Sequence, residues 1–318
     1  MLITFFGVRG SFPVPDKNML RFGGNTSSVL FEKNVNGKKV YLFIDSGFGI
    51  IQAGKYILPS FFNGTASKEF SILFTHLHPD HTEGFTFFAP NFITGIKIHL
   101  LGPSALKKNV GKVLKEKMAP PTYPIEYKDL KSERFHGIVE DEQKIYITSE
   151  GKPVYSAGNN KIVFEIKVMK SFAPSHPQQG CLYYRITDVE TKKSAACIWD
   201  IESRRGGDQR VIAFSKDADI MIHDTQYTDE EYDSDKMIVQ GFGHSTYTMA
   251  VENALKANVK MLVGFHYNPA HTDQKLIEIS GEINKKLQEN GSPLIFHLSA
   301  ERSSIEAENE IIIKDRES

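Results

Sequence analysis

Three histidines and an aspartate are crowded into the stretch FTHLHPDHTEG at residues 74–84. His76 and His78 alternate along the chain, so both side chains point to one side if this segment ends a strand. The proline that follows suits the first position of a helix, which would put Asp80 and His81 in its first turn, facing back toward the strand. Neutral imidazole and carboxylate are ligands for Zn, Mn or Fe(II). We therefore expect a metal site here, and two neighbouring divalent cations suit these four side chains better than one.

Chance is a poor explanation for this spacing. With 11 histidines among 318 residues, three histidines and an aspartate at fixed positions arise in about one chain in a thousand. The stretch alone still leaves open a solvated histidine-rich loop, or a helix cap that happens to contain histidine. The low chance frequency favours the metal site over both.

A two-metal site needs more ligands than this stretch supplies, and three further residues are candidates. His176 lies in SHPQQG, Asp200 in CIWD and His266 in VGFH, each at the C-terminal end of an expected strand or in the loop after one. A single histidine in such a place is more often a hydrogen-bonded structural residue than a ligand. Several together favour ligation, because strand ends on one edge of a sheet converge.

Strands and helices alternate along the chain, and they must position these residues. Expected strands are runs of β-branched and aromatic residues between turn signals, at 2–8, 27–32, 39–45, 70–76 and 97–102, and later in IVFEIKV, LYYRIT, SAACIWD, DIMIHD, LIFHL and EIIIK. Helices are expected after IDSGFG, after a Ser104 cap, after a cap at Ser245 or Thr246, and before a stop at Asn290. This order predicts a single α/β domain over residues 1–318 with mixed sheets, although the order alone also allows a doubly wound fold.

Composition excludes several classes of protein. The formal net charge of -1 provides no general attraction for nucleic acid or an anionic membrane. Cys181 and Cys197 lack the spacing of a metal-binding pair, and they fit buried thiols in a reducing compartment. No basic region precedes the apolar start of the chain, and no apolar run reaches the roughly 20 residues that a membrane span needs. We expect a cytoplasmic protein.

The ordered motifs IDSGFG, HLHPDH, CIWD and VGFH resemble those of the metallo-β-lactamase fold superfamily of binuclear metallohydrolases. The resemblance extends over nearly the whole chain. It implies a four-layer αβ/βα sandwich with two mixed β-sheets and the site at one edge between them. It also implies a role for each matching residue. One metal would be held by His76, His78 and His176, and the other by Asp80, His81 and His266. Asp200 would bridge the two metals, and Asp45 would support the ligands.

Within that superfamily the chain looks closest to the branch of short tRNase Z-like enzymes and PhnP-type phosphodiesterases. The segments GVRGSFPVP, RFGGNTSSVLF, HPQQGCLYYRI, IMIHDTQY and GHSTYTMAVENALKANVKMLVGFH carry this similarity. It implies that His244 contacts the phosphate and assists the leaving group, that Asp224 orients His244, and that Asp80 belongs to the catalytic set. The alternatives are that His244 only packs beside a helix cap, and that Asp224 only binds backbone amides. The classical β-lactamase branch lacks this histidine and often has cysteine at the position of Asp200.

Three further residues are weaker candidates for substrate contact. Arg9 and Asn25 lie in the loop that the family places near the active site, so each is a candidate for binding phosphate, or else a turn or surface residue. His271 in NPAHTD either caps the next helix or lines the outer wall of the pocket.

Residues 119–160 are the least regular part of the chain, with APPTYP, a charged stretch and the short strand KIYIT. We expect an insertion or a lid over the site here. Enzymes of the tRNase Z type hold tRNA with a protruding basic arm rich in glycine and proline. This segment has acidic and basic residues in similar measure and no basic cluster, which favours a smaller substrate.

The sequence therefore predicts a binuclear metal-dependent hydrolase with two divalent ions, zinc first and manganese or iron next. The expected reaction is attack of a metal-bound hydroxide on a small or cyclic nucleotide or a related cyclic phosphate. Alternatives are a hydrolase of carbon esters, thioesters or lactones, a tRNA 3′-processing endonuclease, and a non-catalytic metal-binding protein. We expect a small-molecule partner, no stable complex with nucleic acid and no membrane contact. The resemblance also implies a homodimer.

Overall fold

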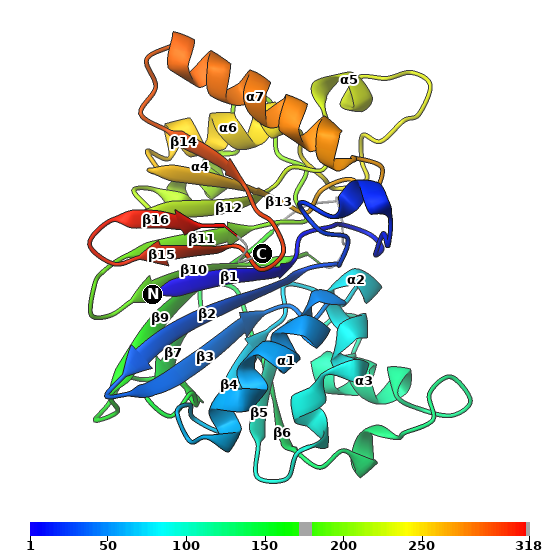
Figure 1. Cartoon of the computed structure of the whole chain (residues 1–318), viewed down its shortest axis with the longest axis vertical. Coiled ribbons are helices and arrows are strands. Elements are labelled where there is room, and N and C mark those ends of the chain that lie inside the picture. Colours follow the sequence, from blue (N-terminus) through cyan, green and yellow to red (C-terminus); the bar gives the residue numbers. More distant parts are fainter. Residues whose placement is uncertain (172–179, 316–318) are drawn as a thin grey trace.

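Two eight-stranded sheets face each other with helices on their outer sides in a computed structural model that describes residues 1–171 and 180–315 (Figure 1). The first sheet has the order β16 (Ile311–Lys314), β15 (Ser304–Ala307), β1 (Leu2–Gly7), β2 (Ser28–Val35), β3 (Lys38–Ile44), β4 (Glu69–Leu73), β5 (Lys97–Gly102) and β6 (Glu133–Ile138). The second has the order β14 (Ile295–Leu298), β13 (Met261–Phe265), β12 (Ile220–Asp224), β11 (Ser194–Ile198), β10 (Leu182–Asp188), β9 (Ile162–Lys170), β7 (Lys144–Thr148) and β8 (Pro153–Val154).

Helices cover the outer face of each sheet. On the first sheet lie α1 (Gly49–Phe62) and α3 (Val110–Lys117), and on the second lie α4 (Gln209–Ser215), α6 (Tyr247–Lys256) and α7 (Asp273–Glu289). Short helical turns complete the described chain: α2 (Pro79–Thr82), α5 (Asp229–Tyr232), η1 (Lys17–Met19), η2 (Glu83–Phe87), η3 (Ala89–Phe92) and η4 (Tyr127–Asp129). The predicted four-layer αβ/βα sandwich with two mixed sheets is confirmed.

The sheets are held together by a core between their inner faces. Phe31 and Leu42 of the first sheet and Phe164 and Tyr184 of the second belong to one buried apolar cluster. A second cluster lies between the first sheet and its helices, where Phe43, Phe70 and Phe88 pack edge to face. Burial on both faces explains why the central strands read as nearly continuous apolar runs.

Each sheet has a parallel half, and this arrangement creates the functional edge. Strands β3, β4, β5 and β6 are parallel in the first sheet, as are β11, β12, β13 and β14 in the second. The carboxyl ends of parallel strands lie at one edge, so residues that follow β3, β4, β11, β12 and β13 come together although they are far apart in sequence.

The segment 119–160, in which we expect an insertion or a lid, contributes strands to both sheets. Its strand β6 forms the edge of the first sheet, while β7 pairs with β9 and β8 pairs with β7 at the edge of the second. An edge strand is bonded on one side only and tolerates exposed charged residues, so ERFHGI carries little apolar signal. This part of the chain completes both sheets.

Two local expectations have different outcomes. The helix expected from a Ser104 cap begins later, because Leu106 and Lys107 adopt left-handed backbone angles in a tight turn and Asn109 caps α3 instead. Thr246 caps α6 as expected, with its side chain accepting a hydrogen bond from the Met249 amide. Among the described helices, none is long and apolar enough to cross a lipid bilayer.

A close backbone approach fixes the metal-motif segment against the loop after β3. A Cβ at Gly84 would lie 2.1 Å from the carbonyl oxygen of Gly47. We predict that Gly84→Ala lowers the free energy of unfolding by about 1–3 kcal/mol, because the backbone must shift to make room. Urea denaturation measures the change.

Gly281 supplies the matched control, because it lies in the exposed interior of α7 and a Cβ there meets no described atom within 4 Å. Gly281→Ala should raise the free energy of unfolding by about 0.5–1 kcal/mol, since alanine is the better helix former. Equal stability of the Gly84→Ala protein and the wild type would contradict the close approach.

Candidate metal centre

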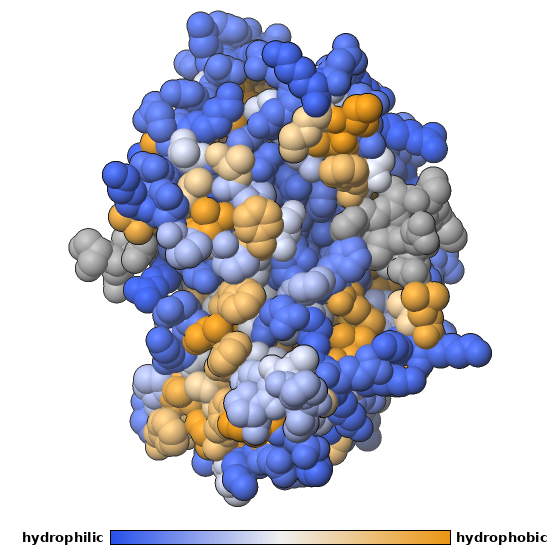
Figure 2. Space-filling view, turned by 90° about the vertical axis from the view of Figure 1, so that its right-hand side faces the viewer, coloured by the Kyte–Doolittle hydropathy of each residue, from blue (hydrophilic) through white to orange (hydrophobic). Residues whose placement is uncertain are grey.

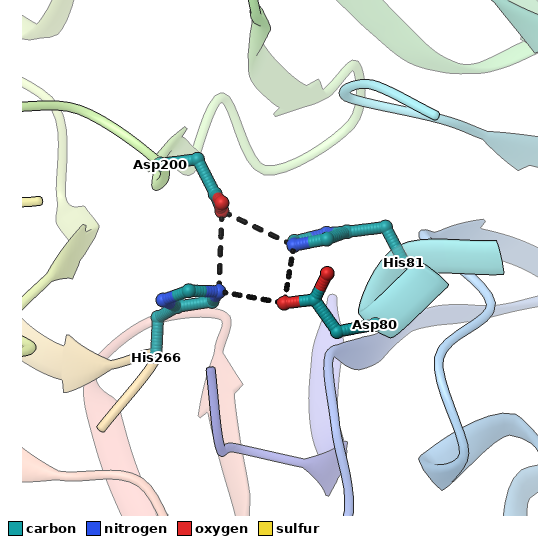
Figure 3. Close-up of side chains that lie close together, drawn as sticks. All are labelled: Asp80, His81, Asp200 and His266. Atoms are coloured by element: carbon teal, nitrogen blue, oxygen red, sulfur yellow. Dashed lines mark hydrogen bonds and ion pairs between the residues drawn. The ribbon is translucent and has the colours of Figure 1, made fainter. Parts of the chain in front are cut away.

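Strand ends from both sheets bring the predicted ligands to one buried place. His76 and His78 follow β4, and His78 precedes the first turn of α2, which carries Asp80 and His81 behind Pro79 at its start. Asp200 follows β11 and His266 follows β13. Figure 3 shows the four side chains of α2, β11 and β13 pointing toward one another.

Four of these side chains surround one point. His81 Nε2 lies 3.3 Å from Asp80 Oδ2 and 3.3 Å from Asp200 Oδ1. His266 Nε2 lies 3.4 Å and 3.3 Å from the same two oxygens (Figure 3). One ligand atom from each of the four lies within 4.8 Å of all the others. Histidine nitrogens and carboxylate oxygens at this spacing suit a divalent cation.

A second group of histidines meets the same aspartate. His76 Nε2 lies 3.5 Å from Asp200 Oδ2, so the two oxygens of Asp200 face different histidines. The His76 ring lies 4.2 Å from the His81 ring and 4.5 Å from the His78 ring, measured between centroids. This is the arrangement that a bridging carboxylate between two ions requires. His176 lies outside the described residues, so its predicted part in the second group stays a prediction, as does ligation by the others.

Buried negative charge provides a test of whether a cation fits. Asp45, Asp80 and Asp224 are each less than a tenth exposed. Within residues 1–171 and 180–315, no lysine or arginine forms an ion pair with any of these three carboxylates. Buried His81 Nε2 accepts or donates no hydrogen bond to a described residue. Buried carboxylates with histidine partners but no lysine or arginine partner among the described residues are costly, so divalent cations fit this donor set.

The electrostatics of the cluster favour positive charge at its centre. Burial alone would lower the pKa of His81, but Asp200, Asp80 and Asp45 outweigh burial and hold that pKa well above its ordinary value. Burial alone would raise the pKa of Asp80, but His81 and His266 hold it well below its ordinary value. Either a proton on His81 or a cation beside its Nε2 would offset the negative charge of these carboxylates.

Asp45 orients the His81 ring through a contact to Nδ1, the ring nitrogen on the side away from the centre. Its carboxylate accepts hydrogen bonds from the Thr75 amide and hydroxyl, both at 2.8 Å, and from Trp199 Nε1 at 2.9 Å. It also lies 2.8 Å from His81 Nδ1, which turns Nε2 toward the centre. The supporting role expected for Asp45 agrees with these contacts. Trp199 is buried and also holds Asp45, a contact for which the sequence carries no signal beyond adjacency to Asp200.

Left-handed backbone turns aim three of these side chains. Asp45, Asp200 and His266 have φ angles of 59°, 56° and 60°. Asp45 and His266 come directly after β3 and β13, and Trp199 separates Asp200 from the end of β11. Such angles cost free energy for residues with a Cβ, and they cluster at functional sites. Residue type and spacing do not reveal them.

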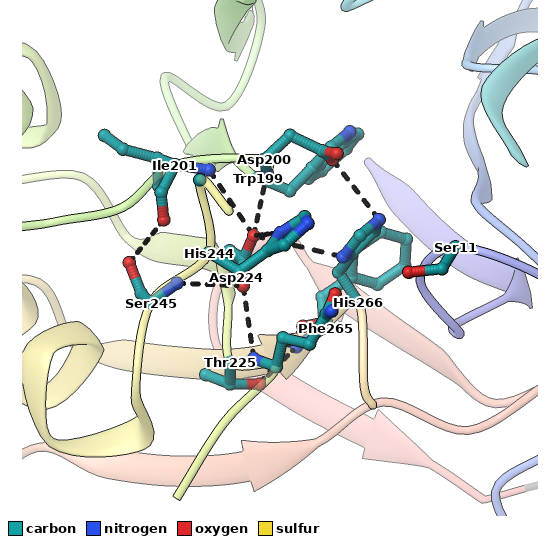
Figure 4. A network of polar contacts seen from close by, with 12 residues as sticks. Ser11, Trp199, Asp200, Ile201, Asp224, Thr225, His244, Ser245, Phe265 and His266 are labelled. Atoms are coloured by element: carbon teal, nitrogen blue, oxygen red, sulfur yellow. Dashed lines mark hydrogen bonds and ion pairs between the residues drawn. The ribbon is translucent and has the colours of Figure 1, made fainter. Parts of the chain in front are cut away.

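A second polar network continues from the centre (Figure 4). His244 Nδ1 lies 2.8 Å from Asp224 Oδ2, and the same oxygen accepts a hydrogen bond from the Asp200 amide at 3.0 Å. The His244 and His266 rings stack with centroids 5.0 Å apart. Asp224 therefore contacts both backbone amides and His244, and its role in orienting His244 stays a prediction. With Nδ1 used, Nε2 is the His244 atom that faces away from Asp224.

The N-terminal loop closes one side of the centre. The Ser11 amide donates a hydrogen bond to Asp80 Oδ2 at 2.8 Å. Gly10 lies so close to His266 that a Cβ there would be 2.5 Å from His266 Nδ1. Only glycine fits this approach, so GVRGSF contributes through its backbone.

Arg9 does not bind phosphate in this arrangement. Its guanidinium is fully buried and donates hydrogen bonds to the carbonyl oxygens of Gly23, Asn268 and His271 at 2.8, 3.1 and 2.6 Å. The guanidinium donors are used within the protein, because buried N–H groups must be paired. Arg9 joins the N-terminal loop to the loop that follows His266.

Asn25 and His271 are also held by other residues. The Asn25 side-chain amide donates a hydrogen bond to Glu301 at 2.9 Å, which is a loop contact. His271 Nε2 lies 2.9 Å from Glu231, and Thr272 is the residue that caps α7. Neither side chain joins the cluster of predicted ligands.

Comparison with known proteins agrees with this fold. The chain is 26% identical over 321 residues to the Ribonuclease Z of Prochlorococcus marinus strain MIT 9515, covering 88% of this chain and 92% of that protein. Its structure is similar to the metallo-β-lactamase fold protein YhfI of Bacillus subtilis, with a TM-score of 0.60 and 17% identity over 95% of this chain and 98% of that one. It is also similar to a diphosphatase of the PhnP family, with a TM-score of 0.61 and 17% identity over 98% and 99%. No family model matches the chain.

We predict that His81→Gln loses most of the bound zinc or manganese, measured by elemental analysis after metal loading and desalting. The matched control is His99→Gln, because His99 on β5 pairs with Glu69 at 2.7 Å and lies outside the cluster. Chelation should lower the melting temperature of the wild type, since free metal at a thousand times its Kd adds about 4 kcal/mol of stability. Equal metal loss from both variants would contradict the site.

Proposed function

Because the chain is a member of the metallo-β-lactamase fold superfamily, in the branch of the tRNase Z and PhnP-type enzymes, we propose that it cleaves RNA phosphodiester bonds. The coarser statement is that it is a metal-dependent hydrolase. Similarity to Ribonuclease Z over almost the full length of both chains supports RNA as the substrate. The observation that carries a phosphodiester reaction is the His244–Asp224 pair beside the donor cluster.

Each part of the site has a task in this proposal. When bound, two divalent cations supply Lewis acidity toward phosphate oxygens and acidify a water molecule. The residues that would hold these cations are His76, His78, His176, Asp80, His81 and His266, with Asp200 between the two cations. Asp45 holds His81 in its orientation, and the Ser11 amide holds Asp80. These groups are placed before substrate arrives, so little reorganisation is needed as charge develops on the phosphate.

His244 is the proposed proton donor. Asp224 Oδ2 lies 2.8 Å from His244 Nδ1 and sets the ring orientation, and we assign donation of a proton to the leaving oxygen to Nε2. The stacked His266 ring and the Asp224 contacts to the backbone restrict His244 to this position. A carbon ester needs less help for its leaving group, so the pair favours a phosphodiester over an ester, thioester or lactone.

The substrate expected from sequence, a small or cyclic phosphodiester, is the second candidate. The similarity to a PhnP-family diphosphatase supports it, as does the lack of a basic cluster in 119–160. The Ribonuclease Z relatives favour RNA instead, against the expectation that the chain binds no nucleic acid stably. Zinc as the metal and a homodimer remain parts of the proposal.

The direct test compares three substrates with zinc- or manganese-loaded protein. We predict cleavage of an RNA hairpin that carries a single-stranded 3′ extension, turnover of bis-p-nitrophenyl phosphate, and no turnover of p-nitrophenyl acetate above background. Chelator and His81→Gln serve as negative controls. Turnover of bis-p-nitrophenyl phosphate without RNA cleavage would move the assignment to the small phosphodiester, and acetate turnover alone would refute both.

His244→Ala should lower the rate of RNA cleavage by about 10²–10⁴-fold, because general acid catalysis is lost. The loss on bis-p-nitrophenyl phosphate should be much smaller, since p-nitrophenolate leaves without a proton. Metal content should match the wild type, and His99→Gln should keep both activities. A fall in metal content, or equal losses on both substrates, would show that His244 has another role.

A further inference from the structure

A pocket of about 950 Å³ opens directly beside the candidate metal centre. Ile201 and Glu202, which line it, follow Asp200 in the chain, and the hydroxyl of lining Tyr183 donates to the Asp200 carbonyl oxygen at 3.4 Å. On its other side the pocket reaches Gly241, three residues before His244. The pocket therefore borders the chain segments that carry Asp200 and His244.

Three arginines line the pocket: Arg204, Arg205 and Arg210. The Arg204 guanidinium is exposed and forms no hydrogen bond or ion pair with any residue that the structure describes. Arg205 pairs with Asp233 at 2.5 Å, but both side chains are exposed, and such pairs are weak enough for a phosphate to replace. Arg210 donates to the Lys170 carbonyl oxygen at 3.0 Å.

Two of the acidic residues in the pocket wall are occupied by protein donors. Glu202 accepts hydrogen bonds from the amides of Gly241 and Gly243 at 2.9 and 3.0 Å and from the Tyr232 hydroxyl at 2.6 Å. Asp208 caps α4 and accepts from the Arg210 and Val211 amides. Glu202 and Asp208 are thus engaged by donors of the protein, and the exposed Arg204 and Arg205 are cations that an anion in the pocket can contact.

An exposed aromatic side chain is next in sequence to the pocket wall at Gly241. Phe242 is 55% exposed, next to Gly241 of the pocket wall and two residues before His244. The face on the side of α2 and α5 is otherwise mostly hydrophilic, with scattered hydrophobic groups (Figure 2). Arginines combined with an exposed aromatic ring are the elements by which proteins hold single-stranded nucleic acid.

We infer that this pocket receives the single-stranded RNA next to the scissile bond, with Arg204, Arg205 and Arg210 contacting its phosphates and Phe242 stacking on a base. The inference rests on the proposed RNA cleavage and deepens it, because it assigns substrate binding to residues of the second sheet's loops. The net charge of -1 is no obstacle, since the contact is local.

The test measures binding of a fluorescein-labelled, phosphorothioate oligo(U) to zinc-loaded protein by anisotropy, from about 50 to 200 mM salt. Arg204→Gln should weaken binding about tenfold and reduce the slope of log K against log salt by about 0.7. Arg204→Lys should keep the slope, because the charge remains. Phe242→Leu should weaken binding without changing the slope, since stacking involves no counterion release.

The matched control is Arg302→Gln, an exposed arginine beside Gln52 on the outer side of the first sheet. Melting curves verify that every variant is folded. Binding by Arg204→Gln that equals the control overturns the pocket, even if the wild type cleaves RNA. Arg204-dependent binding without RNA cleavage by the wild type supports the pocket and refutes the proposed function.

Discussion

Buried carboxylate charge at the meeting edge of two sheets is the constraint on which this molecule depends. Asp45, Asp80, Asp200 and Asp224 lie within one region, each less than a tenth exposed. Like charges at such depth repel one another and have lost water, so the fold needs positive charge at that point. The histidines face these oxygens and supply protons or metal ligation. Burying these carboxylates therefore has an unfavourable free energy, which cations bound at this edge would offset.

The two sheets contribute complementary parts to that site. The first sheet provides Asp45 and the HxHxDH segment, and the second provides Asp200, Asp224 and His266. Neither sheet alone completes the cluster, so packing of the apolar core between them also sets the distances between donor atoms. The rigid support of Asp45 on one side and Asp224 on the other limits how far the side chains shift when substrate or metal arrives.

Substrate choice depends on the surface around the centre more than on the centre itself. The same donor set can hydrolyse different phosphodiesters, and the difference between a small ester and RNA lies in what holds the rest of the substrate. Among the described parts of the second sheet, the loops after β11 and α5 lie next to the centre in sequence. The proposed substrate contacts of Arg204, Arg205 and Phe242 lie in these loops.

The sequence by itself determined the fold class and the choice of candidate donor residues. Apolar runs predicted the strands, and HLHPDH with Asp200, His266, His244 and Asp224 made up most of the predicted site, because residue types and their places near strand ends are local properties. Tertiary structure decided which donors share a point, that Arg9 is a buried link, and that β6 and β8 are edge strands. It also decided the left-handed turns and the Trp199–Asp45 contact. These depend on distances between segments up to 262 residues apart, which no local pattern encodes.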